Sequence, residues 1–124
     1  MVERDFTKVF ERLRAIMAGH AEGLDVVHDT SENYYLNTRH VRRDGYVLMF
    51  GAVQIKARYV SYHLMPVYMW TELLDGMSDG LRKRMQGKAC FNFTRVDEEL
   101  FVELTELTRR GAERGKSAGD AFSR

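Results

Sequence analysis

The spacing of the hydrophobic residues changes twice along the chain, and this limits its possible folds more than any motif does. Within residues 5–18 apolar residues recur every three or four positions, as on the buried face of an amphipathic helix. Within residues 23–65 they follow strand-like patterns, and Asp44-Gly45 is a typical hairpin turn. The helical period returns within residues 97–111. Helices at both ends of a strand-rich middle predict an α+β protein.

The predicted strands are short and are separated by polar or turn-forming residues. A Pro lacks the N–H that a sheet requires, so Pro66 is expected to end one of them. A helical turn over 71–74 and a brief helix capped by Ser78 are expected before the last strand. We therefore predict strands at 24–28, 33–39, 46–55, 59–65 and 88–93, packed by N- and C-terminal helices.

Helix caps suggest where the folded part begins and ends. Asp5 and Asp97 are suitable N-caps, and Gly19 and Gly111 are natural stops. A length of 124 residues suits one domain. The prediction is a single domain over residues 1–111, followed by a flexible tail over 112–124 that is rich in small and charged residues.

Composition argues against several classes of protein. Lys and Arg number 19 against 18 Asp and Glu, so the basic excess typical of nucleic-acid binding is absent and such binding is unlikely. No segment has the run of apolar residues that a membrane span needs. A single cysteine, Cys90, cannot form an internal disulfide. These features predict a cytoplasmic protein that does not bind membranes.

One strand has a mixed face that suggests a contact surface. In strand 59–65 alternate residues are core-like, while the others combine aromatic and polar side chains. Aromatic residues and methionines follow directly, and both are common at interfaces and in ligand pockets. The predicted surface for a small ligand or a second copy of the chain, and so for a homodimer, comprises Tyr59, Ser61, His63, Met65, Tyr68 and Trp70.

Two other sets of residues allow different chemistry. Glu99, Glu103 and Glu106 share a helical face and could bind iron, although acidic residues also suit a solvated helix face. Cys90 could lie on the same sheet face as His63 and Asn92, where a thiol nucleophile would find a base and an orienting amide. An isolated cysteine in a strand is more often a small buried apolar residue, which is the interpretation favoured here.

Three sequence blocks carry a resemblance. Residues 50–56, 59–65 and 87–93, the last followed by a capped helix, resemble the bacterial YdhG-like family, a domain of unknown function. The resemblance covers about residues 45–110. It implies a compact α+β domain with a mainly antiparallel sheet. Some members are described as frataxin-like iron chaperones, which implies iron as an alternative cofactor.

The sequence favours a non-enzymatic module that binds a small ligand or another protein and needs no cofactor. A frataxin-like iron-binding protein is the alternative. A thiol-dependent enzyme that uses Cys90 is the third hypothesis.

Overall fold

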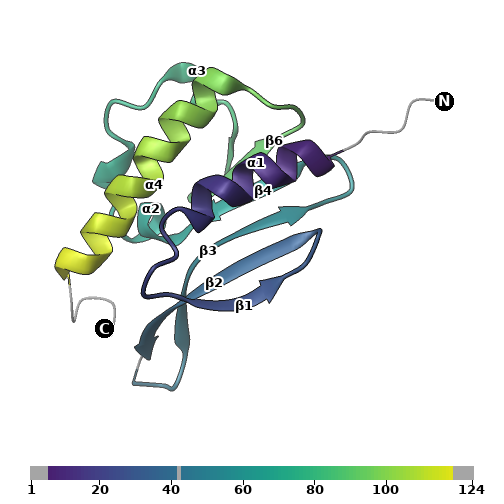
Figure 1. Ribbon diagram of the computed structural model, residues 1–124. Coiled ribbons are helices and arrows are strands. Elements are labelled where there is room, and N and C mark those ends of the chain that lie inside the picture. The colour runs from purple at the N-terminus through teal and green to yellow at the C-terminus, as the bar shows by residue number, and fades with distance from the viewer. Residues whose placement is uncertain (1–5, 42, 119–124) are drawn as a thin grey trace.

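The computed structural model describes residues 6–41 and 43–118 and confirms the predicted α+β class. The strands form one antiparallel sheet, and the helices cover one of its faces (Figure 1). In chain order the elements are α1 (Thr7–Ala18), β1 (Asp25–Asp29), β2 (Asn33–Val41), β3 (Val47–Ile55), β4 (Val60–Leu64), α2 (Met65–Met69), the 3₁₀ helix η1 (Thr71–Leu74), α3 (Asp79–Arg82), β5 (Met85–Gln86), β6 (Cys90–Phe93) and α4 (Glu98–Ala118).

The six strands lie in the order β1-β2-β3-β4-β6-β5, and each neighbouring pair is antiparallel. The first four strands follow one another across the sheet. The chain then leaves the sheet through α2, η1 and α3, and it returns so that β6 pairs with β4 and β5 forms the edge. This return is what brings β6 beside β4, although about thirty residues separate them along the chain.

The sheet alternates between a covered and an open face, most clearly in β4. Val60, Tyr62 and Leu64 are fully buried beneath the helices. Ser61 and His63 point to the opposite face, because successive side chains of a strand alternate. The predicted division of this strand into a core face and a mixed face is therefore confirmed.

Helix α1 packs against the sheet through four buried side chains, which are spaced as on the apolar face of an amphipathic helix: Val9, Phe10, Leu13 and Met17. It starts after Phe6, which makes no side-chain capping bond; the predicted cap Asp5 lies outside the described residues. Its close approach depends on Gly51 in β3, because a Cβ there would lie 2.6 Å from both the His63 carbonyl oxygen and Met17 Cε.

Helix α4 runs to Ala118, so the prediction that it ends at Gly111 is wrong. Gly111 is buried inside the helix, where a Cβ would lie 3.1 Å from Cβ of Pro66 on α2. The glycine is present because two helices pack closely, and it does not terminate α4. Residues 112–118 are thus helical, contrary to the predicted tail, and residues 119–124 lie outside the described part.

Two shorter elements also differ from expectation. Strand β4 ends at Leu64, and Pro66 occupies the first turn of the unpredicted helix α2, where its missing N–H is tolerated. The edge strand β5 was likewise not predicted. Asp97 and Ser78 do act as caps: Asp97 Oδ1 accepts the Leu100 N–H and Ser78 Oγ accepts the Leu81 N–H.

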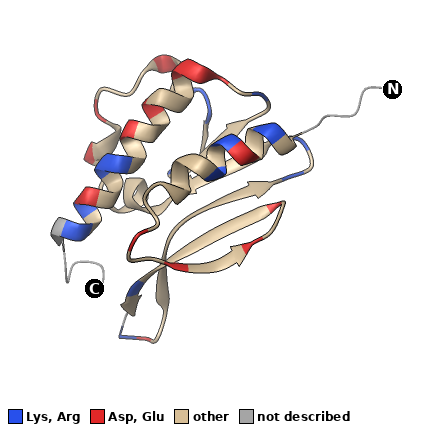
Figure 2. Ribbon diagram, in the orientation of Figure 1, with Lys and Arg blue, Asp and Glu red and all other residues tan. Residues whose placement is uncertain are grey.

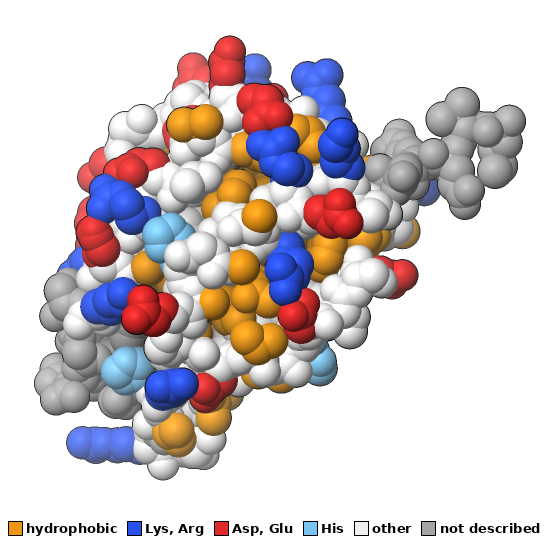
Figure 3. All heavy atoms as spheres, viewed as in Figure 1, with side chains coloured by type: hydrophobic (Ala, Val, Ile, Leu, Met, Phe, Trp, Pro, Cys, Tyr) orange, Lys and Arg blue, Asp and Glu red, His pale blue; other side chains and the backbone are white. Residues whose placement is uncertain are grey.

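Charges of both signs are distributed over the helical side of the molecule (Figures 2 and 3). Helix α4 carries Glu98 and Glu99 in its first turn and Lys116 in its last, an arrangement that favours its dipole. Arg12 on α1 forms a bidentate pair with Glu98, which links the two long helices. Within the described ranges no helix is long and apolar enough to span a membrane.

Candidate functional site on the open face of the sheet

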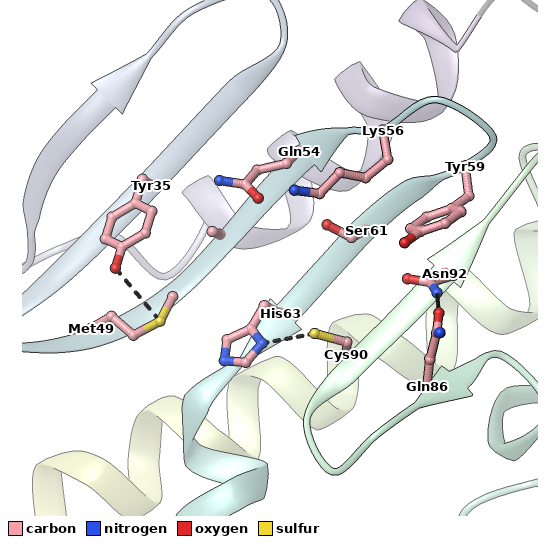
Figure 4. A pocket seen from close by; sticks show the side chains of 11 residues that line it. Tyr35, Met49, Gln54, Lys56, Tyr59, Ser61, His63, Gln86, Cys90 and Asn92 are labelled. Carbon is pink, nitrogen blue, oxygen red and sulfur yellow. Dashed lines mark hydrogen bonds between the residues drawn. The ribbon is translucent and has the colours of Figure 1, made fainter.

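The open face of the sheet contains a hollow of about 350 Å³. It lies on the side away from α1 and α4, which are seen behind the strands in Figure 4. This open-face hollow is lined by side chains from β2, β3, β4, β5 and β6 and from the β3–β4 turn: Tyr35, Met49, Ala52, Gln54, Lys56, Tyr59, Ser61, His63, Gln86, Cys90 and Asn92.

Strand register gathers the polar residues of the hollow. Ser61 in β4 lies opposite Gln54 in β3 and Asn92 in β6. His63, two residues further along β4, lies opposite Cys90. Directly opposed residues on one face are close enough for side-chain contact. The predicted placement of Cys90, Asn92 and His63 on one face is therefore confirmed.

Cys90 and His63 are in direct contact, with 2.8 Å between Cys90 Sγ and His63 Nδ1 (Figure 4). Burial raises the pKa of the Cys90 thiol, and the nearby Lys56 ammonium partly opposes this effect. Burial also lowers the pKa of His63. Both shifts favour the uncharged forms near neutral pH, and in the tautomer with the ring hydrogen on Nε2 the thiol donates its proton to Nδ1.

Several polar groups of the hollow have no partner among the described residues. His63 Nε2 and Asn92 Oδ1 are both buried without a hydrogen bond. Ser61 is only 7% exposed, and its hydroxyl, which points into the hollow, makes no hydrogen bond to a described residue. A buried polar group without a partner costs about 1–3 kcal/mol. Such a concentration of them suggests that something else supplies the partners.

The Lys56 side chain extends over the hollow and is exposed to solvent (Figure 4). No ion pair or hydrogen bond of its ammonium is found among the described residues, and no Asp or Glu is present among the eleven lining residues. The amides are more constrained: Asn92 Nδ2 donates to Gln86 Oε1 at 2.6 Å, and Gln54 Nε2 donates to Asn33 Oδ1 at 3.1 Å. The hollow therefore presents one uncompensated positive charge among neutral hydrogen-bonding groups.

The six residues of the predicted contact surface are divided between the hollow and the region of α2. Tyr59, Ser61 and His63 line the hollow, but Met65, Tyr68 and Trp70 do not. The reason is that the strand ends at Leu64, so the residues after it follow the course of α2. Tyr68 is 55% exposed, with Lys88 Nζ 5.8 Å from its ring centroid, and the partly buried Trp70 lies 4.9 Å beneath the Arg114 guanidinium.

The acidic face proposed for iron is used in part for structural contacts. Glu103 accepts hydrogen bonds from the backbone N–H and the hydroxyl of Ser78, and Glu106 pairs with Arg109. In residues 6–41 and 43–118 no group of three or more His, Cys, Asp or Glu side chains could hold a metal ion. Glu99 is thus not gathered with Glu103 and Glu106 into a metal site.

Sequence reasoning missed Gln54, Lys56 and Gln86 as members of the hollow. Residues 46–55 are apolar on both faces of the strand, so the single polar Gln54 gives little indication of a site. Lys56 lies between the predicted strands 46–55 and 59–65, and Gln86 belongs to the short strand that was not predicted. The strand register places Gln54 opposite Ser61 and Gln86 opposite Cys90, and Lys56 reaches the hollow from the turn between β3 and β4.

Comparisons with protein-family models, with curated proteins and with solved structures found no match. The YdhG-like resemblance therefore stays a prediction. The geometry of the hollow is therefore the basis for a proposed function.

Proposed function

We propose that this protein binds a small anionic metabolite in the open-face hollow. The observation that carries the proposal is a hollow in which several polar groups have no hydrogen-bond or ion-pair partner among the described residues: the Lys56 ammonium, the Ser61 hydroxyl, His63 Nε2 and Asn92 Oδ1. The volume of about 350 Å³ is at the lower end of ligand sites, which favours a small molecule over a large cofactor.

The charge of the ligand follows from the lining residues. Lys56 contributes a positive charge, and no lining carboxylate neutralises it. A carboxylate is the simplest group to pair with it, while hydroxyl or amide groups of the ligand would match Ser61 and Asn92. Tyr35 and Tyr59 at the rim add aromatic surface on which such a molecule can rest.

The test is a thermal-shift and calorimetric screen with small mono- and dicarboxylates, each compared with its neutral amide. The protein carries Cys90→Ala so that only reversible binding is measured. We expect at least one carboxylate to bind and its amide to bind about tenfold more weakly, a difference of about 1.4 kcal/mol. Lys56→Met should remove this preference, whereas Lys8→Met, on the exposed surface of α1, should not.

Equal binding of acids and amides by the Cys90→Ala protein would contradict the anionic class of ligand. The absence of binding by every carboxylate, at concentrations up to about 10 mM, would contradict the proposed function itself, since such affinities correspond to less than about 3 kcal/mol.

A further inference from the structure

We propose that Cys90 is the nucleophile of a thiol–disulfide exchange site in the open-face hollow, with a small carboxylate-bearing disulfide as its substrate and His63 as the proton acceptor. The proposal rests on the proposed function only for the anionic class of the substrate. The thiol chemistry itself stands on the contact between the two side chains.

The Cys90 thiol already has a base within reach. Nδ1 of His63 lies 2.8 Å from Sγ of Cys90, so the proton can pass directly between them. Cys90 is held in β6 and His63 in β4, and these strands are paired at this position. Two paired strands fix the contact more firmly than a loop would.

The Cys90 thiol faces the open-face hollow, which a substrate can enter. Cys90 is partly exposed, and it lines the same hollow as Lys56 and Ser61. Ser61 is only 7% exposed, and its hydroxyl points into this space and makes no hydrogen bond to a described residue, which independently indicates a ligand here. A cysteine that only filled the core would lie on the helix-covered face with Phe91 and Phe93.

The reaction balances without any further reagent. As His63 Nδ1 takes the thiol proton, Sγ of Cys90 attacks one sulfur of the substrate disulfide. A new S–S bond joins Cys90 to that half of the substrate, and the original S–S bond breaks. The leaving thiolate takes the proton from His63, so Cys90 is oxidised to a mixed disulfide and the other half of the substrate is reduced to a free thiol.

Lys56 makes the site selective. Its ammonium lies close enough to Cys90 to oppose the rise in the pKa of the thiol caused by burial. A carboxylate on the disulfide would be attracted to the same ammonium, which would place the substrate sulfur near Sγ. A neutral disulfide gains nothing from this charge.

The experiment measures the rate at which the thiol reacts with two aromatic disulfides, the dianionic dithiobis(nitrobenzoate) and the neutral dithiodipyridine. Because Cys90 is the only cysteine, the signal reports on it alone. Relative to the same protein unfolded in urea, we expect folded Cys90 to react about tenfold faster with the anionic reagent near pH 7. Lys56→Met should slow this reaction and leave the neutral reagent unaffected, and Lys8→Met should alter neither rate.

The pH profile tests the role of His63. The titratable groups that face Cys90 are His63 on β4, Lys56 and Tyr59 on the β3–β4 turn and Tyr35 on β2; Gln86 on β5 does not titrate. With a histidine base the rate should be nearly constant between the low pKa of His63 and the high pKa of Cys90. In His63→Asn, which keeps a hydrogen-bond acceptor but loses the base, the rate should rise about tenfold per pH unit, as for a free thiol.

Each outcome has one meaning. If folded Cys90 reacts more slowly than in urea with both reagents, the exchange site is refuted, and carboxylate binding by Cys90→Ala is unaffected by that result. If His63→Asn keeps the constant rate, His63 is not the proton acceptor. If Cys90 reacts rapidly but Lys56→Met changes neither rate, the chemistry stands and the anionic substrate class, shared with the proposed function, is refuted.

Discussion

His63 illustrates how one residue can have an unsatisfied buried atom and still be useful. Its Nδ1 is matched to the Cys90 thiol, while its Nε2 is buried without an acceptor. A protonated ring would place a positive charge in this partly buried position and would lose the acceptor for the thiol proton. Burial accordingly lowers the pKa of His63 below the value near 6.5 that an exposed histidine has.

A pH dependence of stability follows from this shift. Below about pH 6.5 the unfolded chain takes up a proton at His63 before the folded protein does. The free energy of unfolding should therefore fall with decreasing pH until the lower pKa of the folded state is passed. The measurement is urea unfolding of the wild type and His63→Asn between about pH 8 and pH 3.

The variant should lose this part of the pH dependence and keep the part below about pH 4.5, which arises from carboxylates such as Glu98 and Asp29, whose pKa values are lowered by Arg12 and Arg14. Identical curves for both proteins would show that the pKa of His63 is not shifted on folding.

The buried contact between Tyr62 and Thr108 provides a second test at this scale. The two hydroxyls are 2.7 Å apart, and Thr108 also donates to the Leu104 carbonyl at 2.8 Å. Removing the tyrosine hydroxyl leaves Thr108 with a partner, so Tyr62→Phe should cost about 1 kcal/mol. Thr108→Val leaves a buried tyrosine hydroxyl without one, so it should cost more, about 2–3 kcal/mol.

Chemical denaturation of both single variants and of the double variant measures these costs and their coupling. Once both hydroxyls are absent, the double variant should be less destabilised than the sum of the two single changes. Thr108 uses its hydrogen for the Leu104 carbonyl, so Tyr62 is the donor to Thr108. A Tyr62→Phe cost equal to or above that of Thr108→Val would contradict this arrangement.

For the candidate site, the sequence predicted the sheet face of several residues but not which of them lie opposite one another. Alternation along residues 59–65 correctly separated Tyr59, Ser61 and His63 from the core residues. The partner strands supply Gln54, Cys90 and Asn92, and their positions depend on register across the sheet. A strand pattern repeats every two residues and so fixes which face a residue occupies, but it does not identify the residue opposite.

At the scale of elements, those with a clear period, cap or turn signal were predicted, and two short elements without one were not. The helix near the start, the hairpin turn at Asp44-Gly45, the short helices η1 and α3 and the strands β1, β2, β3, β4 and β6 were all expected. Helix α2 and strand β5 have five and two residues, too few for any period to be recognised. These elements form because the neighbouring chain positions them, and that information is not local.

The end of α4 shows why a glycine can mislead. Gly111 is of the residue type that often ends a helix, yet its role is to let α4 approach Pro66. Beyond it, Ala112 packs against the core, Arg114 covers Trp70 and Gly115 is buried. The last turns of α4 therefore belong to the folded unit.

Truncation tests this conclusion. A chain that ends after Gly111 should lose about 1–3 kcal/mol of stability and several degrees in Tm, because it uncovers Trp70 and removes Ala112 from the core. A chain that ends after Ala118 is the matched control and retains every helical contact described. Calorimetry of both proteins gives the comparison, and an unchanged Tm in the shorter chain would show that residues 112–118 contribute nothing to packing.

At the scale of the whole molecule, the two faces of the sheet have separate tasks. The helices bury one face and supply the apolar core, with Leu13, Tyr62 and Leu104 fully buried. The other face carries the hollow and its polar side chains. Side chains in the hollow can therefore be changed with little effect on the core, which makes the variants proposed above practical tests of function.

The alternation within β4 makes this division of tasks fragile in one respect. A single residue inserted before Val60 or deleted from the turn that precedes it would rotate every later side chain of the strand to the other face, unless the turn absorbed the change. His63 would then point into the hydrophobic core, and Tyr62 would point into the hollow. Point substitutions can vary the binding chemistry gradually, but a change of length here would abolish the fold and the site together.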